Sequence, residues 1–169
     1  MFSKIDIGRI VRDHLATLRD DATGQRMKSD YFLFFGLPVV LASFLLLVLD
    51  LSQDRGAVGI LVTSLSIFAA LLFNLLLLIY DVVRKHEPGS RNLRDALLSQ
   101  VYSNISFAIL VSILSIILLL AAYFDLNCSF FTLATSFAAY YLVSLFMLTL
   151  FMILKRVHIL LSNEFEDRS

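Results

Sequence analysis

The chain contains 169 residues, of which 59% are hydrophobic and 17% are charged. Soluble domains are roughly 45–50% apolar and about 25% charged, so this composition excludes an ordinary water-soluble globule. Fourteen basic and fourteen acidic residues leave no net charge, so no overall field favours nucleic acid or an acidic ligand. The single cysteine excludes an intramolecular disulfide framework and a cysteine-based zinc site.

The sequence of residues 1–30 predicts an amphipathic helix that lies outside the bilayer. Ser3 can cap this helix, with Asp6 three residues further on, and Gly24 is a stop signal. Its apolar side chains follow helical spacing along one face, namely Ile7, Ile10, Val11, Leu15 and Leu18. We expect this face to pack on the protein's own helices, on a neighbouring subunit or on a partner protein.

Four stretches are long and apolar enough to cross a bilayer, which requires about 20 residues each. They contain no Asp, Glu, Lys or Arg, and they are Tyr31–Leu49, Ala57–Tyr80, Val101–Phe124 and Phe130–Leu154. The first is expected to be an anchor and not a signal peptide, because the mostly polar residues 1–30 precede it. The predicted fold is an all-α integral membrane protein, with a four-transmembrane-helix bundle over residues 31–154 and a C-terminal extension over 155–169.

The basic residues predict the orientation of these spans. Thirteen lie in the N-terminal segment, in the loop between the second and third spans, or in the C-terminal tail, whereas the two other loops hold Arg55 alone. We therefore expect both termini on the cytoplasmic side. The external loops, 50–56 and 125–129, are too short to form a ligand-binding domain.

Residues 81–100 are expected to form a cytoplasmic helical hairpin. It breaks at Glu87–Ser90, where proline and glycine end one helix and a serine can start the next. The hairpin carries the basic residues predicted to bind a partner, and these are Arg84, Lys85, Arg91 and Arg94. The apolar stripe at Ile10, Leu15 and Leu18 is the second predicted partner-binding surface.

No catalytic, cofactor-binding or metal-binding residues are predicted. His14, His86 and His158 lie outside the spans, and His14 lies on an apolar helix face, where a packed histidine is the ordinary explanation. The sequence contains no glycine-rich phosphate loop, no metal-ligand cluster and no nucleophile–base pair. An enzyme is therefore not expected.

Uncharged polar groups lie inside the predicted spans. Asn74 and Asn104 both fall near the cytoplasmic side, where a hydrogen bond between them, within a subunit or across an interface, would stabilise by about 0.6–2 kcal/mol. Such polar contacts join helices, or alternatively line a pore. Tyr140 and Tyr141 fall near the centre of the fourth span, so at least one phenol should face protein or a water-filled cavity. Because four helices offer little interior, a homo-oligomer in membrane lipid is expected, a tetramer being one form.

The chain resembles the membrane subunit of the two-gene bacterial antiphage system called Kiwa. The resemblance lies in the layout of four spans and in two segments, Asp30-Tyr-Phe-Leu-Phe-Phe-Gly-Leu-Pro38 and Tyr102-Ser-Asn-Ile-Ser-Phe-Ala-Ile-Leu110. It implies a homo-oligomeric sensor of phage attack in the bacterial inner membrane. It also implies a soluble cytoplasmic effector that binds DNA as the partner, with no direct nucleic-acid binding by this chain.

The expected function is thus a membrane scaffold or sensor that recruits a cytosolic effector. The alternative is an oligomeric pore-forming effector or small channel, in which Ser, Thr and Asn side chains line a water path. An accessory chain of a larger transporter is a third class.

Overall fold

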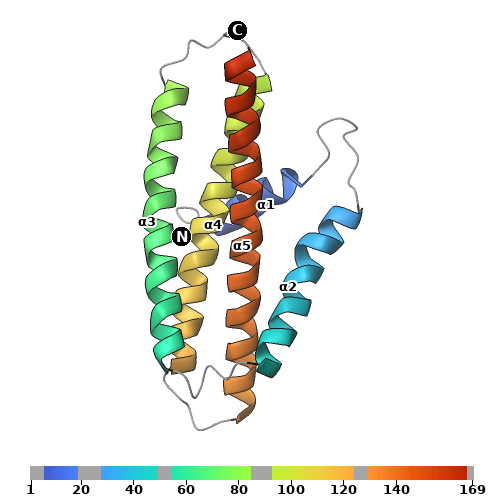
Figure 1. Cartoon of the computed structure of the whole chain (residues 1–169), viewed down its shortest axis with the longest axis vertical. Helices are drawn as coiled ribbons and strands as arrows, with labels where there is room; N and C mark the ends of the chain where they lie inside the picture. Colours follow the sequence, from blue (N-terminus) through green and yellow to red (C-terminus); the bar gives the residue numbers. More distant parts are fainter. Residues whose placement is uncertain (1–5, 19–27, 49–54, 85–92, 124–128, 167–169) are drawn as a thin grey trace.

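The computed structural model describes residues 6–18, 28–48, 55–84, 93–123 and 129–166, which form five α-helices (Figure 1). The helices are α1 Ile7–Ala16, α2 Lys28–Val48, α3 Arg55–Arg84, α4 Leu93–Tyr123 and α5 Ser129–Glu166. Three helical segments are long and apolar enough to cross a membrane, namely Arg55–Arg84, Leu97–Tyr123 and Phe130–Ser162. The described apolar part of α2, Phe32–Val48, is shorter. The described residues thus form an all-helical protein of the kind found in membranes.

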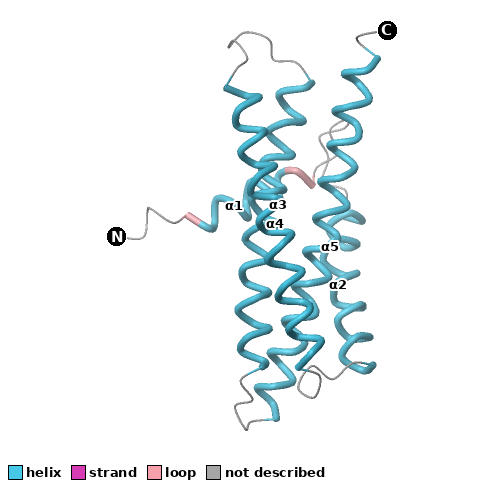
Figure 2. Tube along the Cα trace, turned by 60° about the vertical axis from the view of Figure 1, so that its left-hand side comes forward, coloured by secondary structure: helices cyan, strands magenta, loops and turns pink. Residues whose placement is uncertain are grey.

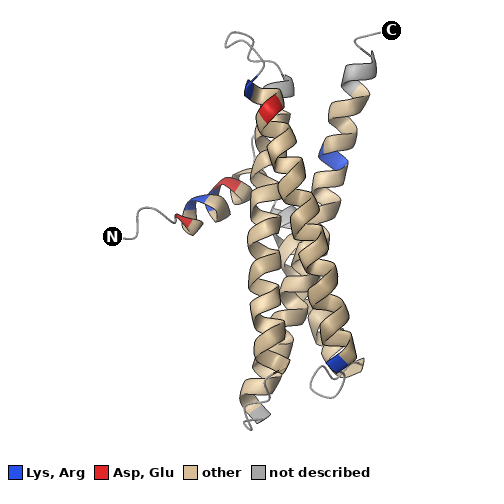
Figure 3. Cartoon of the chain, turned by 90° about the vertical axis from the view of Figure 1, so that its left-hand side faces the viewer, with Lys and Arg blue, Asp and Glu red and all other residues tan. Residues whose placement is uncertain are grey.

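Charged residues lie near the ends of the long helices and on α1, and the middle of the long helices carries none (Figure 3). In α3 the uncharged segment is 56–80, and in α5 it is 129–154. Each is longer than the about 20 residues that a bilayer core requires. We call the end of the molecule that holds Arg84 and the last turns of α5 the Arg84 end.

The four long helices lie in the order α3, α4, α5, α2, with α2 and α3 at opposite edges (Figure 1). Among the described residues α3 packs on α4, and α2 packs on α5, but α2 and α3 do not meet. Phe68 of α3 and Phe146 of α5 do reach each other, with ring centroids 6.0 Å apart. The arrangement is therefore more open than a closed bundle, in which each helix has two long neighbours.

α3 packs on α4 through aliphatic side chains that recur every seven residues. This spacing keeps one stripe facing a neighbouring helix. The buried stripe consists of Val58, Leu65, Leu72 and Ile79. At the opposite end from Arg84, the guanidinium of Arg55 lies over the ring of Tyr123, 5.1 Å from its centroid, and joins the start of α3 to the end of α4.

α4 and α5 form the most extensive helix pair, and both bury small side chains that allow close approach. These are Ala108, Ser112 and Ser115 on α4, and Thr135, Ser136 and Ala139 on α5. The hydroxyls of Ser115 and Thr149 donate to backbone carbonyls four residues earlier, at 2.8 and 2.9 Å. Their hydrogen bonds are therefore satisfied within their own helices.

The helices extend beyond the predicted spans at the Arg84 end. α3 continues to Arg84, α4 begins at Leu93, and α5 continues to Glu166. α5 contains no glycine or proline that would end it. The predicted break at Glu87–Ser90 lies in residues 85–92, outside the described residues. Most of the two predicted external loops lies in residues 49–54 and 124–128, which are also outside them.

The limits predicted for the N-terminal helix are wrong. The cap of α1 is Asp6, whose carboxylate accepts a hydrogen bond from the backbone N–H of Arg9 at 3.1 Å. The helix ends at Ala16, where the Thr17 hydroxyl turns back to the carbonyl of His14 at 2.7 Å. The predicted cap Ser3 and the predicted stop Gly24 lie outside the described residues.

Candidate functional site

α1 lies across the long helices and packs its apolar face on them (Figure 2). Leu18 is buried, and Ile10, Val11 and Leu15 are half-buried against the core. The predicted partner-binding stripe is therefore covered by the protein's own helices in this structure. This is the first of the three packing arrangements that the sequence allows.

His14 lies within the covered face of α1 and has no exposed surface. Its Nδ1 donates a hydrogen bond to Oδ1 of Asn104 on α4, at 2.8 Å. Its ring stacks on Phe107 with centroids 3.8 Å apart and an interplanar angle of 2°, and Phe34 of α2 lies 5.3 Å away. One side chain of α1 therefore contacts two of the long helices.

Thr17 and Arg156 complete this contact at the C-terminal end of α1. The Thr17 hydroxyl lies 2.9 Å from Asn104 Oδ1, so its single proton is shared between that oxygen and the His14 carbonyl. Nη2 of Arg156 on α5 donates to the backbone carbonyl of Thr17 at 2.5 Å. The negative end of the helix dipole stabilises a cation at this position. We call His14, Thr17, Asn104, Phe107 and Arg156 the α1 junction.

The environment keeps His14 neutral. The pKa of His14 is lowered from 6.5 to about 4: burial lowers it most, the hydrogen bond to Asn104 raises it in part, and the nearby charge of Arg156 lowers it. Since Nδ1 carries the proton that Asn104 accepts, Nε2 is left as an acceptor. A protonated His14 would place a buried cation beside the half-buried cation of Arg156.

The α1 junction and its surroundings include polar atoms that are buried without a hydrogen-bond partner among the described residues. Examples are His14 Nε2, Asn104 Nδ2 and Ser103 Oγ. An unpaired buried polar group costs about 1–3 kcal/mol, and holding a bridging water in place costs up to about 2 kcal/mol. The hydrogen bonds that fasten α1 are therefore partly offset by polar atoms to which no described residue bonds.

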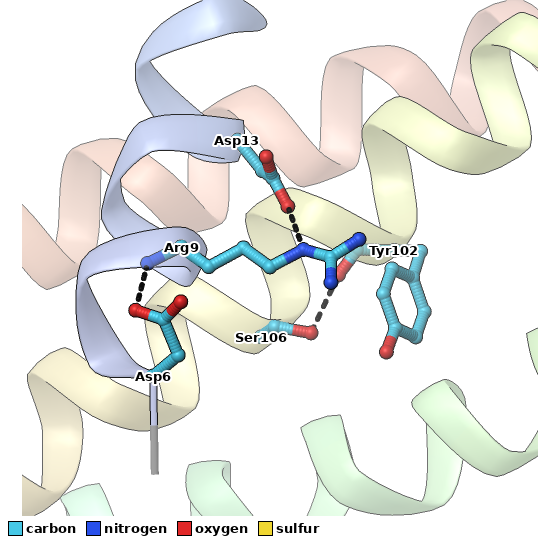
Figure 4. Close-up of polar contacts among 5 residues, drawn as sticks. All are labelled: Asp6, Arg9, Asp13, Tyr102 and Ser106. Carbon is cyan, nitrogen blue, oxygen red and sulfur yellow. Dashed lines mark hydrogen bonds and ion pairs between the residues drawn. The ribbon is translucent and has the colours of Figure 1, made fainter. Parts of the chain in front are cut away.

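The outer face of α1 is charged and remains at the surface. Arg9 Nε lies 3.7 Å from Asp13 Oδ2, and both side chains are exposed. Figure 4 shows this pair above α4, where the Ser106 hydroxyl donates to the carbonyl of Tyr102 at 2.9 Å. Exposed pairs of this kind contribute little to stability, so docking of α1 depends on its buried face.

The structure separates the two asparagines that were predicted to pair. Asn104 is fully buried and bonds to His14 and Thr17, whereas Asn74 is exposed on α3. An Asn74–Asn104 hydrogen bond is therefore not formed within the chain. Tyr140 is buried and Tyr141 is half-buried in the protein.

The predicted basic partner surface is described only in part. Arg84 is exposed in the last turn of α3, and Arg94 lies in the first turn of α4. Lys85 and Arg91 lie outside the described residues.

Sequence reasoning missed Thr17 and Arg156 and assigned His14 to ordinary packing. His14 and Thr17 are three residues apart on an otherwise apolar face, which places two polar groups side by side on a helix. Arg156 lies two residues after the end of the apolar segment of α5. These two signals together could have indicated a polar contact beneath the N-terminal helix.

The fold and the α1 junction define a class of protein: an all-helical membrane protein in which buried polar groups fasten a short amphipathic helix to the long helices. Comparison of the chain with protein-family models, with curated proteins and with solved structures finds no match. Among the residues that the structure describes, no three His, Cys, Asp or Glu side chains gather as a metal site would require.

Proposed function

We propose that the protein is a membrane-embedded sensor and scaffold that forms homo-oligomers in the bacterial inner membrane and recruits a cytosolic effector. The observation that carries this proposal is the α1 junction. Because α1 bonds to both α4 and α5, a shift of one long helix against the other changes the position of α1. A change within the membrane is thereby transmitted to a helix at its surface.

The proposed topology has four spans, with both termini in the cytosol. Two observations support it: thirteen of fourteen basic residues lie in the segments assigned to the cytosol, and α2 adds an apolar helix beside α5. The Arg84 end is then cytosolic, and α1 lies at the cytosolic surface of the membrane. Output to a soluble partner is available on that side.

Asn74 supports self-association. It is exposed on α3, two residues from the buried Leu72 and therefore on the opposite side of the helix. Thr63 and Gly59 lie on the same outer side, and a Cβ added at Gly59 would meet nothing within 4 Å. An amide is both donor and acceptor, so Asn74 of two copies can pair and stabilise by about 0.6–2 kcal/mol.

The proposed biological setting is antiphage defence. The two segments that resemble the Kiwa membrane subunit both contribute to the docking of α1, one through Phe34 and the other through Asn104 and Phe107. A soluble DNA-binding effector is the proposed partner, and this chain itself is not proposed to bind nucleic acid.

Recruitment tests this proposal. Reversing the charges at Arg84, Lys85, Arg91 and Arg94 should reduce, at least tenfold, the amount of the neighbouring gene's product that copurifies with the protein. Reversal of Arg9 and Arg12 on the exposed face of α1 is the matched control. Full retention of the partner after the four reversals, with topology intact, would contradict docking at the hairpin.

The alternative function is an oligomeric pore. The specific observation in its favour is that exposed Asn74, Thr63 and Ser66 lie along α3, where an oligomer could enclose them. If the protein conducts, liposomes that contain it should leak ions and Asn74→Leu should reduce the leak. Tight liposomes under every trigger tried would favour the scaffold.

A further inference from the structure

We propose that α1 is a reversible latch, which docks through the α1 junction and, on release, exposes the apolar side chains of Ile10, Leu15 and Leu18. The release of α1 does not depend on the proposed function.

α1 cannot hold its own shape without the long helices. It has ten residues, and isolated helices shorter than about 12–15 residues are marginal in water. Asp6 supplies its N-terminal cap, but the C-terminal carbonyl of Thr17 is capped by Arg156 of α5. Undocking removes that cap, so release and loss of helix are expected to occur together.

The polar atoms of the junction favour opening. His14 Nε2 and Asn104 Nδ2 have no hydrogen-bond partner among the described residues, and both would be hydrated after release. By contrast, the buried hydroxyls of Ser112 and Ser115 are satisfied, because they donate hydrogen bonds to backbone carbonyls of α4 itself. Two apolar side chains in place of His14 and Asn104 would keep α1 packed on α4 without leaving buried polar atoms unbonded.

The apolar contact is also shallow. Leu18 is buried, but Ile10, Val11 and Leu15 are only half-buried, and Ile7 is 46% exposed. The loss of apolar burial that opposes release is correspondingly small. The hydrogen bonds of the α1 junction are partly offset by unbonded polar atoms, and little apolar surface is buried. The contact of α1 with the long helices can therefore open without unfolding α4 or α5.

Hydrogen–deuterium exchange of the full-length protein in lipid nanodiscs tests the latch. Asn104→Ala should make the α1 amides exchange at least tenfold faster, because His14 loses its acceptor. His14→Leu combined with Asn104→Leu should make them exchange at least tenfold slower than in the wild type. Ser43→Leu, a polar-to-apolar change at an exposed position of α2, should leave α1 exchange unchanged.

A purely structural junction predicts a different result. If the double Leu variant exchanges faster in α1 than the wild type, while α4 and α5 keep their protection, the latch is wrong. If the double Leu variant loses protection throughout the protein, Arg156→Met is the deciding variant. It keeps the aliphatic part of the side chain but removes the cap of α1, so α1 exchange must become faster. Unchanged α1 exchange in Arg156→Met would overturn the proposal. Because the measurement needs no partner, a failed latch leaves recruitment by residues 81–100 standing, and failed recruitment leaves the latch standing.

Discussion

Asn104 joins two parts of the protein because its one carbonyl oxygen serves two residues of α1. It accepts from His14 Nδ1 at 2.8 Å and lies 2.9 Å from the Thr17 hydroxyl, within an apolar segment of α4. A polar side chain at such a position is costly unless it is bonded, so its presence indicates a specific contact. The sequence predicts that Asn104 has a polar partner but suggests Asn74, and the partners within the chain are His14 and Thr17, because the choice depends on which helix crosses α4 there.

The docking of α1 should weaken as the pH falls from 7 towards 5. The pKa of His14 is about 4 when docked and 6.5 when free, so the released state binds more protons within this window. The free energy of docking is largest well above pH 6.5. Well below pH 6.5 it falls by about 1.4 kcal/mol for each pH unit, until the docked form is also protonated near pH 4. Between pH 6.5 and 5.5, α1 amide exchange should therefore rise about fivefold after correction for its intrinsic pH dependence.

Two variants control for other titrating groups. His14→Leu combined with Asn104→Leu should abolish this dependence, and His158→Gln, at an exposed position of α5, should preserve it. A pH-independent α1 in the wild-type protein would show that His14 is not linked to docking.

Helices α2 to α5 could be anticipated from the sequence because each contains one of the four uncharged apolar stretches. Their ends could not, since α3, α4 and α5 continue as helices through polar residues that hydropathy does not detect. The limits of α1 depend on Asp6 and Thr17, which compete locally with other capping signals such as Ser3. The order of the long helices depends on which faces meet, and a nearly uniform apolar surface on each helix does not encode that choice.

A small residue in α5 provides a test of its packing. Ala139 is fully buried, so Ala139→Leu should overpack the core and destabilise the protein by about 1–3 kcal/mol. The melting temperature in detergent should fall by roughly 2–10 °C. Ala134→Leu adds the same atoms at an exposed position of α5 and should have little effect. Equal melting temperatures for the two variants would contradict the packing of α5.

The long helices have an uncharged middle, and α1 crosses them between this middle and the Arg84 end (Figure 3). Composition and charge distribution predict the membrane class and the orientation. The junction that links α1 to the long helices requires three-dimensional contacts between residues up to 139 positions apart, and single-sequence patterns do not reveal those contacts. The proposed flow of information, from membrane helices to a cytosolic helix, depends on α1 lying on the cytosolic side.

The side of the membrane on which α1 lies is therefore the most direct test. Arg12 is exposed on α1, so Arg12→Cys combined with Cys128→Ser presents one thiol there. In intact spheroplasts a membrane-impermeant maleimide should leave this thiol unlabelled and should label it after permeabilisation, whereas native Cys128, in the predicted external loop, should be labelled without permeabilisation. Labelling of the Arg12→Cys thiol in intact spheroplasts, with Cys128 of the wild type protected, would contradict the account.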